Sequence, residues 1–591
     1  MKSFFKNVLS AALGFILGTI LLFFLFIGIT SLIIASFGDN EVAVKEKTIL
    51  HLRLDEEIRE RSSDNPFSDI DLGSMGPSSH TGLDDVLDCI RKAANDDNIK
   101  GIYLDIPFLQ AGLASTEEIR NALLEFKKSG KFIYAFADNY SQGSYYLASA
   151  SDSIFLNPEG SMMMNGLATQ LMFFKGTLEK LEVEPQVIRH GKYKSAVEPF
   201  ILEKMSDENR RQIAGFIDPM WSHLRNRIGA SRSIPMDRLE ELADSLTIRT
   251  AKDAVKTGLV DSLVYYDQFL GLLNKKAGLK QDDEPRFVSL SSYTKAPDSD
   301  KKGKAFAKDK IAVIYAVGEI SDGEGDEESI GSDNLAETIR EARLDEKVKA
   351  IVLRVNSPGG DALASEEIWR ETVLARQAKP FIVSMGDLAA SGGYYISCAA
   401  DKIVAQPTTL TGSIGVFGLM FNIENMMKNK LGITTDTYKT GPFGDFGSMT
   451  RPMNESEKMI LQAEVDRIYN VFSSRVAQGR RMDQAYVDSI GQGRVWTGKS
   501  ALSIGLVDTL GGLDVAIAIA AKKAKITEYR ISSLPKKKEF FEELMEDLST
   551  EAKLRMIGQE LPAPASALQS INRSLRSNGV KAFSPYGVRF D

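Results

Sequence analysis

Two residues of this chain have side chains that could together perform acyl transfer, although they lie far apart in the sequence. Ser391 stands in the small-residue run ASGG (390–393), and Lys194 stands in the run YKSAVEPF (193–200). A serine hydroxyl is a weak nucleophile until a neighbouring base accepts its proton. Histidine is the usual base, and a lysine amine is a recognised alternative. The sequence therefore predicts Ser391 as a nucleophile and Lys194 as its general base.

The histidines of the chain are poorly placed to act as that base. All four lie in the first half of the chain, at His51, His80, His190 and His223. A histidine base local to Ser391 is therefore excluded. A lysine base must lose its charge, which requires burial or cationic neighbours to lower its pKa from about 10.4 toward 7. We expect Lys194 to be buried, with Arg189 and Lys192 lowering its pKa further if they lie close.

Three glycines near the predicted nucleophile could supply the electrostatic part of the same chemistry. Gly359 and Gly360 follow Pro358 at the end of a predicted strand, and Gly392 directly follows Ser391. A glycine backbone turns sharply and exposes its N–H group without side-chain obstruction. Two N–H donors aimed at one point form an oxyanion hole, in which each donor lowers the barrier by about 3 kcal/mol. We expect these glycines to form that hole.

Each of these residue types has a commoner structural role. A serine in a small-residue turn before a helix is more often an N-cap than a nucleophile, and a lysine is usually an exposed cation. A Pro-Gly-Gly run is a common loop. Only the joint distribution of these residues over the chain favours a catalytic role for Ser391 and Lys194.

An internal duplication separates the two candidates. The run DDNIKGIYLDI (96–106) matches DEKVKAIVLRV (345–355), at an offset of 249 residues. An offset of this size indicates two copies of a whole domain rather than a short structural repeat. In the first copy, Gln142 stands in the place of Ser391, and the consecutive glycines of the second copy are lost.

The second copy in turn lacks the lysine. In gapless register from the Met-Ser and Met-Asn pairs at 205 and 453, the segment 438–448 has no lysine opposite Lys194. Lys439 lies a few residues upstream, so this absence depends on where a gap is placed. The first copy therefore has the predicted base, and the second copy has the predicted nucleophile and oxyanion glycines.

Short β-branched runs alternate with amphipathic stretches in each copy, which predicts an α/β fold. In the second copy we expect a helix over 334–345 and strands over 311–320, 350–355, 381–386 and 402–407. The chain then divides into a cytoplasmic stub and anchor (1–40), a first domain (41–280), a linker (281–308), a second domain (309–535) and a tail (536–591).

The first forty residues predict a membrane anchor. No charged residue lies between Lys6 and Asp39, and the apolar run 8–37 exceeds the roughly 20 residues that span a bilayer. Lys2 precedes this run and Glu41 follows it, which keeps the amino terminus in the cytoplasm and the body outside. A cleaved signal peptide is the alternative, but its apolar stretch is usually about 7–15 residues.

The composition of the 591-residue chain is that of a folded globular protein, with 43% hydrophobic and 26% charged residues and a net charge of −8. This mild charge disfavours a nucleic-acid-binding protein, which would carry a basic surface. Cys89 and Cys398 lie in different copies, so the sequence contains no disulfide framework and no CxxC site. We expect neither a metal nor another cofactor.

Four runs of the chain resemble signal peptide peptidase A, also called protease IV, in its long, duplicated bacterial form. These runs are YKSAVEPF (193–200), NSPGG (356–360), ASGGYY (390–395) and TGSIGVFG (411–418). The resemblance covers nearly the whole chain, to about residue 530. It implies two tandem domains of the Clp protease/crotonase type, built from spiral ββα units and assembled as a homo-tetramer.

The resemblance also implies roles for individual residues. It places the nucleophile on Ser391, the general base on Lys194 and the oxyanion donors on Gly360 and Gly392. Ser413, in the run TGSIG, resembles the residue that orients the lysine.

The resemblance further implies a substrate and a location. Members of the family degrade released signal peptides at the bacterial cytoplasmic membrane, so the expected partners are apolar peptides, the membrane and further copies of the chain. Two other functions stay open, a crotonase-like acyl-CoA enzyme with the same oxyanion hole and a non-catalytic membrane scaffold. An extracytoplasmic body disfavours the acyl-CoA enzyme, because CoA is cytoplasmic.

Overall fold

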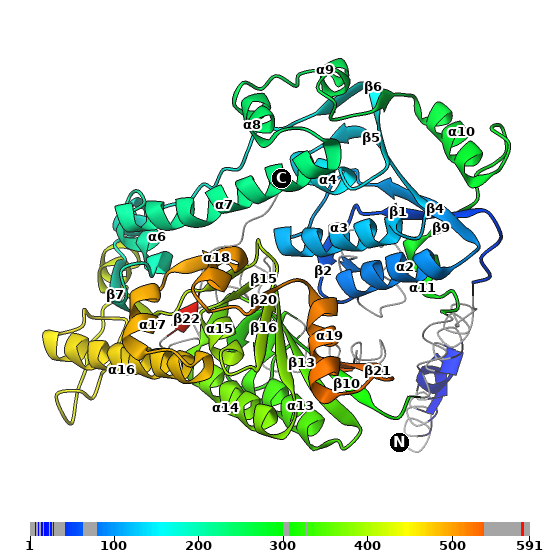
Figure 1. Ribbon diagram of the computed structural model, residues 1–591. Helices are drawn as coiled ribbons and strands as arrows, with labels where there is room; N and C mark the ends of the chain where they lie inside the picture. The colour runs from blue at the N-terminus through cyan, green and yellow to red at the C-terminus, as the bar shows by residue number, and fades with distance from the viewer. Residues whose placement is uncertain are drawn as a thin grey trace.

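The computed structural model describes residues 6, 10, 13–15, 17–22, 24–25, 28, 42–62, 80–298, 307–326, 328–536 and 581–583. Among the residues described, no helical segment combines the length and the hydrophobicity that spanning a bilayer requires. The predicted anchor falls mainly on residues outside this described part. The described chain forms two α/β copies, which Figure 1 shows side by side, the first in blue to green and the second in green to orange.

A parallel sheet of six strands forms the centre of the first copy. The strands lie in the order β8-β6-β5-β4-β1-β9, and all neighbours run parallel. Their bounds are β1 (Thr48–Arg53), β4 (Ile99–Asp105), β5 (Phe132–Tyr140), β6 (Ser153–Met162), β8 (Ser262–Leu263) and β9 (Phe287–Ser289). The helices around this sheet are α2 (Leu83–Asn95), α3 (Leu113–Lys127), α4 (Gln142–Ala148), α9 (Ala251–Lys256), α10 (Tyr266–Ala277) and α11 (Leu290–Thr294).

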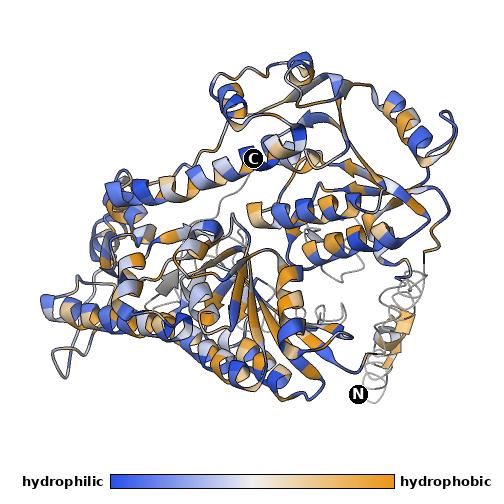
Figure 2. Cartoon of the chain, viewed as in Figure 1, coloured by the Kyte–Doolittle hydropathy of each residue, from blue (hydrophilic) through white to orange (hydrophobic). Residues whose placement is uncertain are grey.

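The second copy has an equivalent sheet of eight strands, in which β21, β10, β13, β15, β17 and β19 are neighbours in that order and β16 and β20 branch from β15. Their bounds are β10 (Lys310–Val317), β13 (Val348–Ser357), β15 (Phe381–Ala390), β16 (Lys402–Ala405), β17 (Leu410–Gly412), β19 (Val495–Thr497), β20 (Thr509–Leu510) and β21 (Arg530–Leu534). Nearly every residue of β13 is buried, as is typical of a parallel strand covered on both faces. Figure 2 shows hydrophobic residues concentrated along these strands.

The helices of the second copy pack on both faces of its sheet, as Figure 1 shows. They are α13 (Ser332–Leu344), α14 (Ala362–Ala378), α15 (Gly392–Ser397), α16 (Glu455–Arg480), α17 (Gln484–Ile490), α18 (Gly498–Ser503) and α19 (Leu513–Ala524). The predicted helix over 334–345 and the four predicted strands are confirmed as α13, β10, β13, β15 and β16. The predicted α/β class is confirmed with them.

The strand order confirms the duplication. In the first copy β9, β1, β4 and β5 are neighbours in that order, and in the second copy β21, β10, β13 and β15 repeat it. In each copy, a strand that follows the helices in the sequence returns to pair with the first strand of the sheet: β9 pairs with β1, and β21 pairs with β10. In the first copy this returning strand, β9, lies inside the segment 281–308 that the sequence assigned to a linker. Part of that segment therefore completes the first sheet.

A third sheet joins the two copies. Its strand order is β12-β11-β14-β22-β18-β7. The bounds are β7 (Glu184–His190), β11 (Glu319–Ser321), β12 (Ser329–Gly331), β14 (Gly359–Asp361), β18 (Val416–Asn422) and β22 (Lys581–Phe583). Strand β7 of the first copy pairs antiparallel with β18 of the second over its full length, from His190 opposite Val416 to Glu184 opposite Asn422. This ladder brings the chain just after β7 against the second copy.

Buried charges also connect the copies. Arg354 of β13 contacts two carboxylates of the first copy, Glu60 at 2.8 Å and Glu118 at 2.7 Å, and all three side chains are at most 4% exposed. Burial alone would lower the pKa of Arg354, but attraction to the two carboxylates outweighs burial and raises that pKa. Asp387 of β15 accepts hydrogen bonds from the first backbone amides of α3, at Ala114 and Ser115. The interface therefore depends on matched charges as well as apolar packing.

We predict that Arg354→Leu lowers the free energy of unfolding by about 3–5 kcal/mol, because it leaves two buried carboxylates without a counter-charge. Urea denaturation followed by circular dichroism measures this loss. The matched control is Lys349→Leu, which removes an exposed cation from the same strand and should change the stability by less than about 0.5 kcal/mol. Equal stability of the two variants would contradict the proposed contribution of the buried ion pairs.

Candidate active site

Ser391 lies between β15 and α15, at the carboxyl end of a strand of the second sheet. Its backbone has φ 56° and ψ −116°, which non-glycine residues rarely adopt. Such strain costs about 1–3 kcal/mol and is concentrated at functional sites. The Ser391 N–H donates to the Gly412 carbonyl oxygen at 2.8 Å, and its hydroxyl makes no capping hydrogen bond to α15. The commoner role as an N-cap is therefore excluded.

Lys194 follows β7 of the first copy and precedes a short 3₁₀ turn, η2 (Ser195–Val197). Its Nζ donates hydrogen bonds to Ser391 Oγ at 2.9 Å and to Ser413 Oγ at 3.2 Å. The exposed fractions of the three residues are 1% for Lys194, 0% for Ser391 and 2% for Ser413. Three side chains from distant parts of the sequence, and from both copies, therefore meet in one buried cluster.

Burial lowers the pKa of Lys194 to about 7. A shift from 10.5 to about 7 corresponds to about 5 kcal/mol by which the site disfavours the ammonium form. The cause is desolvation, and the expected contribution of Arg189 and Lys192 is absent. Around the amine lie the ring of Phe417, with its centroid 5.8 Å from Nζ, and Gly415 of the second copy. Near neutral pH, a large share of Lys194 is therefore uncharged and able to accept a proton.

The segment that carries Lys194 is fixed on both sides. The Tyr193 N–H donates to the Gln492 carbonyl oxygen at 2.9 Å. Downstream, the buried carboxylate of Glu198 accepts hydrogen bonds from Ser206 Oγ at 2.5 Å and from Asn209 Nδ2 at 2.9 Å. Sequence reasoning missed Glu198 as an anchor, although it lies within the run YKSAVEPF. These bonds hold the lysine segment against the start of α7 (Asp207–Arg232).

Gly493 is a second contact that sequence reasoning missed. A Cβ added to it would lie 2.6 Å from the Lys194 backbone nitrogen and 2.7 Å from Lys194 Cβ, so no other residue fits there without displacing the lysine. Gly493 has φ 83°, which also favours glycine. The run GQG at 491–493 was the feature of the sequence that could have indicated this contact.

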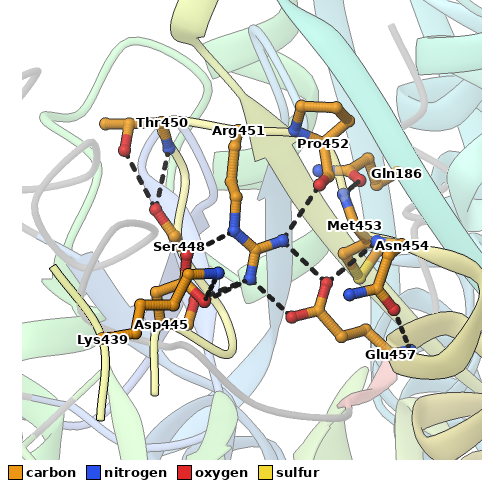
Figure 3. A network of polar contacts seen from close by, with 10 residues as sticks. All are labelled: Gln186, Lys439, Asp445, Ser448, Thr450, Arg451, Pro452, Met453, Asn454 and Glu457. Carbon is orange, nitrogen blue, oxygen red and sulfur yellow. Dashed lines mark hydrogen bonds and ion pairs between the residues drawn. The ribbon is translucent and has the colours of Figure 1, made fainter. Parts of the chain in front are cut away.

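The second copy holds the corresponding segment in a different way. The guanidinium of Arg451 donates to Asp445 at 2.6 and 2.8 Å and to Glu457 at 2.8 and 2.5 Å, as Figure 3 shows. Lys439 Nζ also donates to Asp445, at 2.8 Å, so Lys439 is held in this network. Hydrogen bonds from Arg451 and Lys439 hold the pKa of Asp445 well below its usual range. Lys439 is therefore held by Asp445 and does not substitute for Lys194.

The predicted oxyanion glycines lie beside the serine. A Cβ added to Gly392 would lie 3.1 Å from the Gly360 backbone nitrogen, so the two amides are neighbours. A Cβ on Gly360 would lie 1.9 Å from the Ile320 carbonyl oxygen, and only glycine allows β14 to approach β11 this closely. The Gly359 N–H donates to Ser357 Oγ at 3.2 Å. Gly360 and Gly392 therefore remain as the better placed pair of donors.

This arrangement can perform acyl transfer. It contains a buried hydroxyl, an amine that is partly neutral near pH 7 and two adjacent backbone amides, which are the parts that such a reaction requires. Within the described part of the chain, no group of three or more His, Cys, Asp or Glu side chains could hold a metal ion. The fold and the site together define a serine hydrolase.

Comparison with known proteins gives the family. The model of peptidase family S49 matches twice, over residues 125–280 and 374–527, once in each copy. The chain is 39% identical to Protease 4 of Salmonella typhi over 88% of this chain and 86% of that protein. It is 39% identical to Protease 4 of Haemophilus influenzae over 73% and 71% of the two chains. It is 37% identical to the chloroplastic serine protease SPPA of Arabidopsis thaliana over 74% and 64%.

The chain therefore belongs to peptidase family S49, as a member with a duplicated family domain, and it is a serine protease. This confirms the resemblance noted in the sequence. It also decides against the acyl-CoA enzyme and the non-catalytic scaffold.

The pKa of Lys194 predicts the pH dependence of the reaction. With Lys194 as the general base the neutral amine would be the reactive form, and kcat/KM should then rise tenfold per pH unit below a pKa of about 7 and level off above it. At pH 5 we expect about 1% of the plateau value. Steady-state assays of a fluorogenic peptide from pH 5 to 9 measure the profile, with circular dichroism as the control for folding. An acid limb near pH 4, typical of a carboxylate base, would contradict the role of Lys194.

Proposed function

We propose that this chain is an endopeptidase with a Ser/Lys dyad, in which Ser391 attacks the peptide carbonyl and Lys194 accepts the serine proton. The observation that carries this proposal is the 2.9 Å hydrogen bond between Lys194 Nζ and Ser391 Oγ, made by an amine that burial keeps partly neutral. In the neutral form, Nζ has a lone pair directed at the hydroxyl, and the same hydrogen bond can then run from Oγ to Nζ.

The reaction proceeds in two stages. As Ser391 Oγ bonds to the carbonyl carbon, its proton passes to Lys194 Nζ, and the amides of Gly360 and Gly392 stabilise the negative oxygen. Lys194 then gives the proton to the leaving amine, and an acyl-enzyme remains on Ser391. The same lysine then takes a proton from water as the water oxygen bonds to the acyl carbon, and it returns that proton to Ser391 Oγ as the bond between Oγ and the acyl carbon breaks. Ser413 accepts a hydrogen bond from Nζ at 3.2 Å, which keeps the amine pointed at Ser391.

The proposed substrates are apolar peptides, including signal peptides released at the bacterial cytoplasmic membrane. The apolar run 8–37 supports this substrate class, because a single-pass anchor would keep the catalytic body beside the membrane in which such peptides are released. With the amino terminus in the cytoplasm, the body would lie on the extracytoplasmic side. Each copy would have the Clp protease/crotonase type of fold.

We also propose that the protein assembles as a homo-tetramer. Two segments, one from each copy, lie side by side, since Lys430 pairs with Glu182 at 2.9 Å. These two segments, 172–182 and 430–433, expose the apolar side chains of Met172, Phe174, Leu181, Leu431 and Ile433, with exposed fractions from 39% to 71%. A large apolar patch on a soluble surface is typical of an interface. Sedimentation velocity measures the oligomer, and a monomer at micromolar concentration would contradict this assembly.

We predict that Ser391→Ala and Lys194→Ala each lower kcat/KM by at least about 10³-fold, the scale expected when a serine or its base is removed. Lys192→Ala is the matched control, because Lys192 is exposed and lies two residues away. A fluorophosphonate should label Ser391 in the wild type and should not label Ser391→Ala. Substantial activity in either dyad variant, at wild-type folding, would refute the assignment.

A further inference from the structure

Strand β22 comes from the tail of the chain and lies between β14 and β18 in the third sheet (Figure 1, red). It runs antiparallel to β14, with Ala582 opposite Gly360, and antiparallel to β18, with Lys581 opposite Phe417. Residues 537–580 separate β22 from the described end of the second copy, so chain connectivity does not force β22 into this position.

The strand pairs with residues that border the proposed catalytic pair. On one side, Ala582 faces Gly360, whose amide nitrogen would lie 3.1 Å from a Cβ on Gly392, directly after Ser391. On the other side, Lys581 faces Phe417, whose ring centre is 5.8 Å from Lys194 Nζ. The backbone of β22 therefore lies between the strand that carries Gly360 and the strand that carries Phe417 beside the lysine, where the scissile part of a peptide would have to lie.

The place that β22 occupies is one strand wide. The other edge of β14 is paired with β11, and the other edge of β18 is paired with β7. Without β22, the free edges of β14 and β18 would face each other across about 10 Å, twice the usual spacing of strands. Unpaired strand edges bind extended peptides through main-chain hydrogen bonds. An extended substrate at Ser391 would need the same two edges that β22 uses.

We infer that residues 581–583 occupy the peptide-binding position of the active site and act as a reversible, intramolecular inhibitor of this protease. The inference rests on the proposed function, because it takes Ser391 and Lys194 as the reacting pair. Main-chain pairing makes binding tolerant of sequence, so the tail competes with peptides of many sequences. Because it is covalently attached, its local concentration does not fall when the protein is diluted.

Two variants test the inference, one truncated and one of full length. Truncation after Lys536 removes β22, and Ala582→Pro removes a backbone N–H and disfavours the central strand position. We expect each to lower KM for a fluorogenic apolar peptide by about 3- to 10-fold with kcat unchanged, as for loss of a competitive inhibitor. The matched control is Ser574→Pro, the same kind of substitution in the tail outside β22, which should leave KM unchanged.

Addition of the tail as a separate peptide provides an independent readout. A synthetic peptide of residues 576–588 should inhibit the truncated enzyme competitively, and the same peptide with proline at position 582 should inhibit it at least about tenfold more weakly. The intact mass of the wild type should stay that of the full chain during the assay. Loss of the tail by cleavage at β22 would overturn the inference, because the strand would then be a substrate.

The inference and the proposed function fail in different ways. If truncation and Ala582→Pro both leave KM unchanged while Ser391→Ala abolishes activity, the tail does not inhibit and the dyad stands. If Ser391→Ala retains activity, the dyad itself fails.

Discussion

In the proposed reaction, the Lys194 amine must be partly uncharged beside the Ser391 hydroxyl inside the protein, and the rest of the structure bears on this requirement. A lysine amine loses its charge near neutral pH only when water is removed from it, and removing water requires atoms on every side. Here Lys194 belongs to the first copy, while Phe417, Gly415 and Gly493 around it belong to the second. The site therefore exists only where the two copies meet. The β7–β18 ladder and the buried ion pairs of Arg354 with Glu60 and Glu118 hold the two copies together.

The two copies use equivalent helix starts to hold their variable segments. Ser206 caps α7 and Asn454 caps α16, and each accepts a hydrogen bond from the amide three residues on. In the first copy, Asn209 and Ser206 donate hydrogen bonds to Glu198, and these bonds hold the segment that carries Lys194 against the helix start. In the second copy, the residue at the position of Asn209 is Glu457, which binds Arg451. One change of residue type at a shared position thus accompanies the loss of the base from the second copy.

Much of the site could be predicted from the sequence, because duplication supplies an internal comparison. Ser391 and Gly360 are absent from one copy and Lys194 from the other, so a difference in residue type identified them without any structure. The cause of the lowered pKa could not be obtained this way. Charges nearby in sequence, at Arg189 and Lys192, suggested electrostatic repulsion, whereas burial by distant residues causes the shift.

The fold was predictable where a strand has a local pattern and unpredictable where pairing alone defines it. The apolar run of β13 identifies a buried parallel strand. Strand β9 has only three residues, FVS, of which only Val288 is buried, and it forms because β1 presents a free edge. Strand β22 is likewise defined by its neighbours β14 and β18. Short strands of this kind depend on contacts that no local periodicity records.

The ladder between β7 and β18 has a consequence for the biosynthesis of the protein. The proposed base, Lys194, is made first, but the strand that covers it ends at Asn422, and the proposed nucleophile, Ser391, lies between them in the sequence. A nascent chain that has completed only its amino-terminal half carries a solvated, charged lysine and no serine at the site. Translation must therefore pass residue 422 before the proposed base, the proposed nucleophile and the strand that covers them can come together.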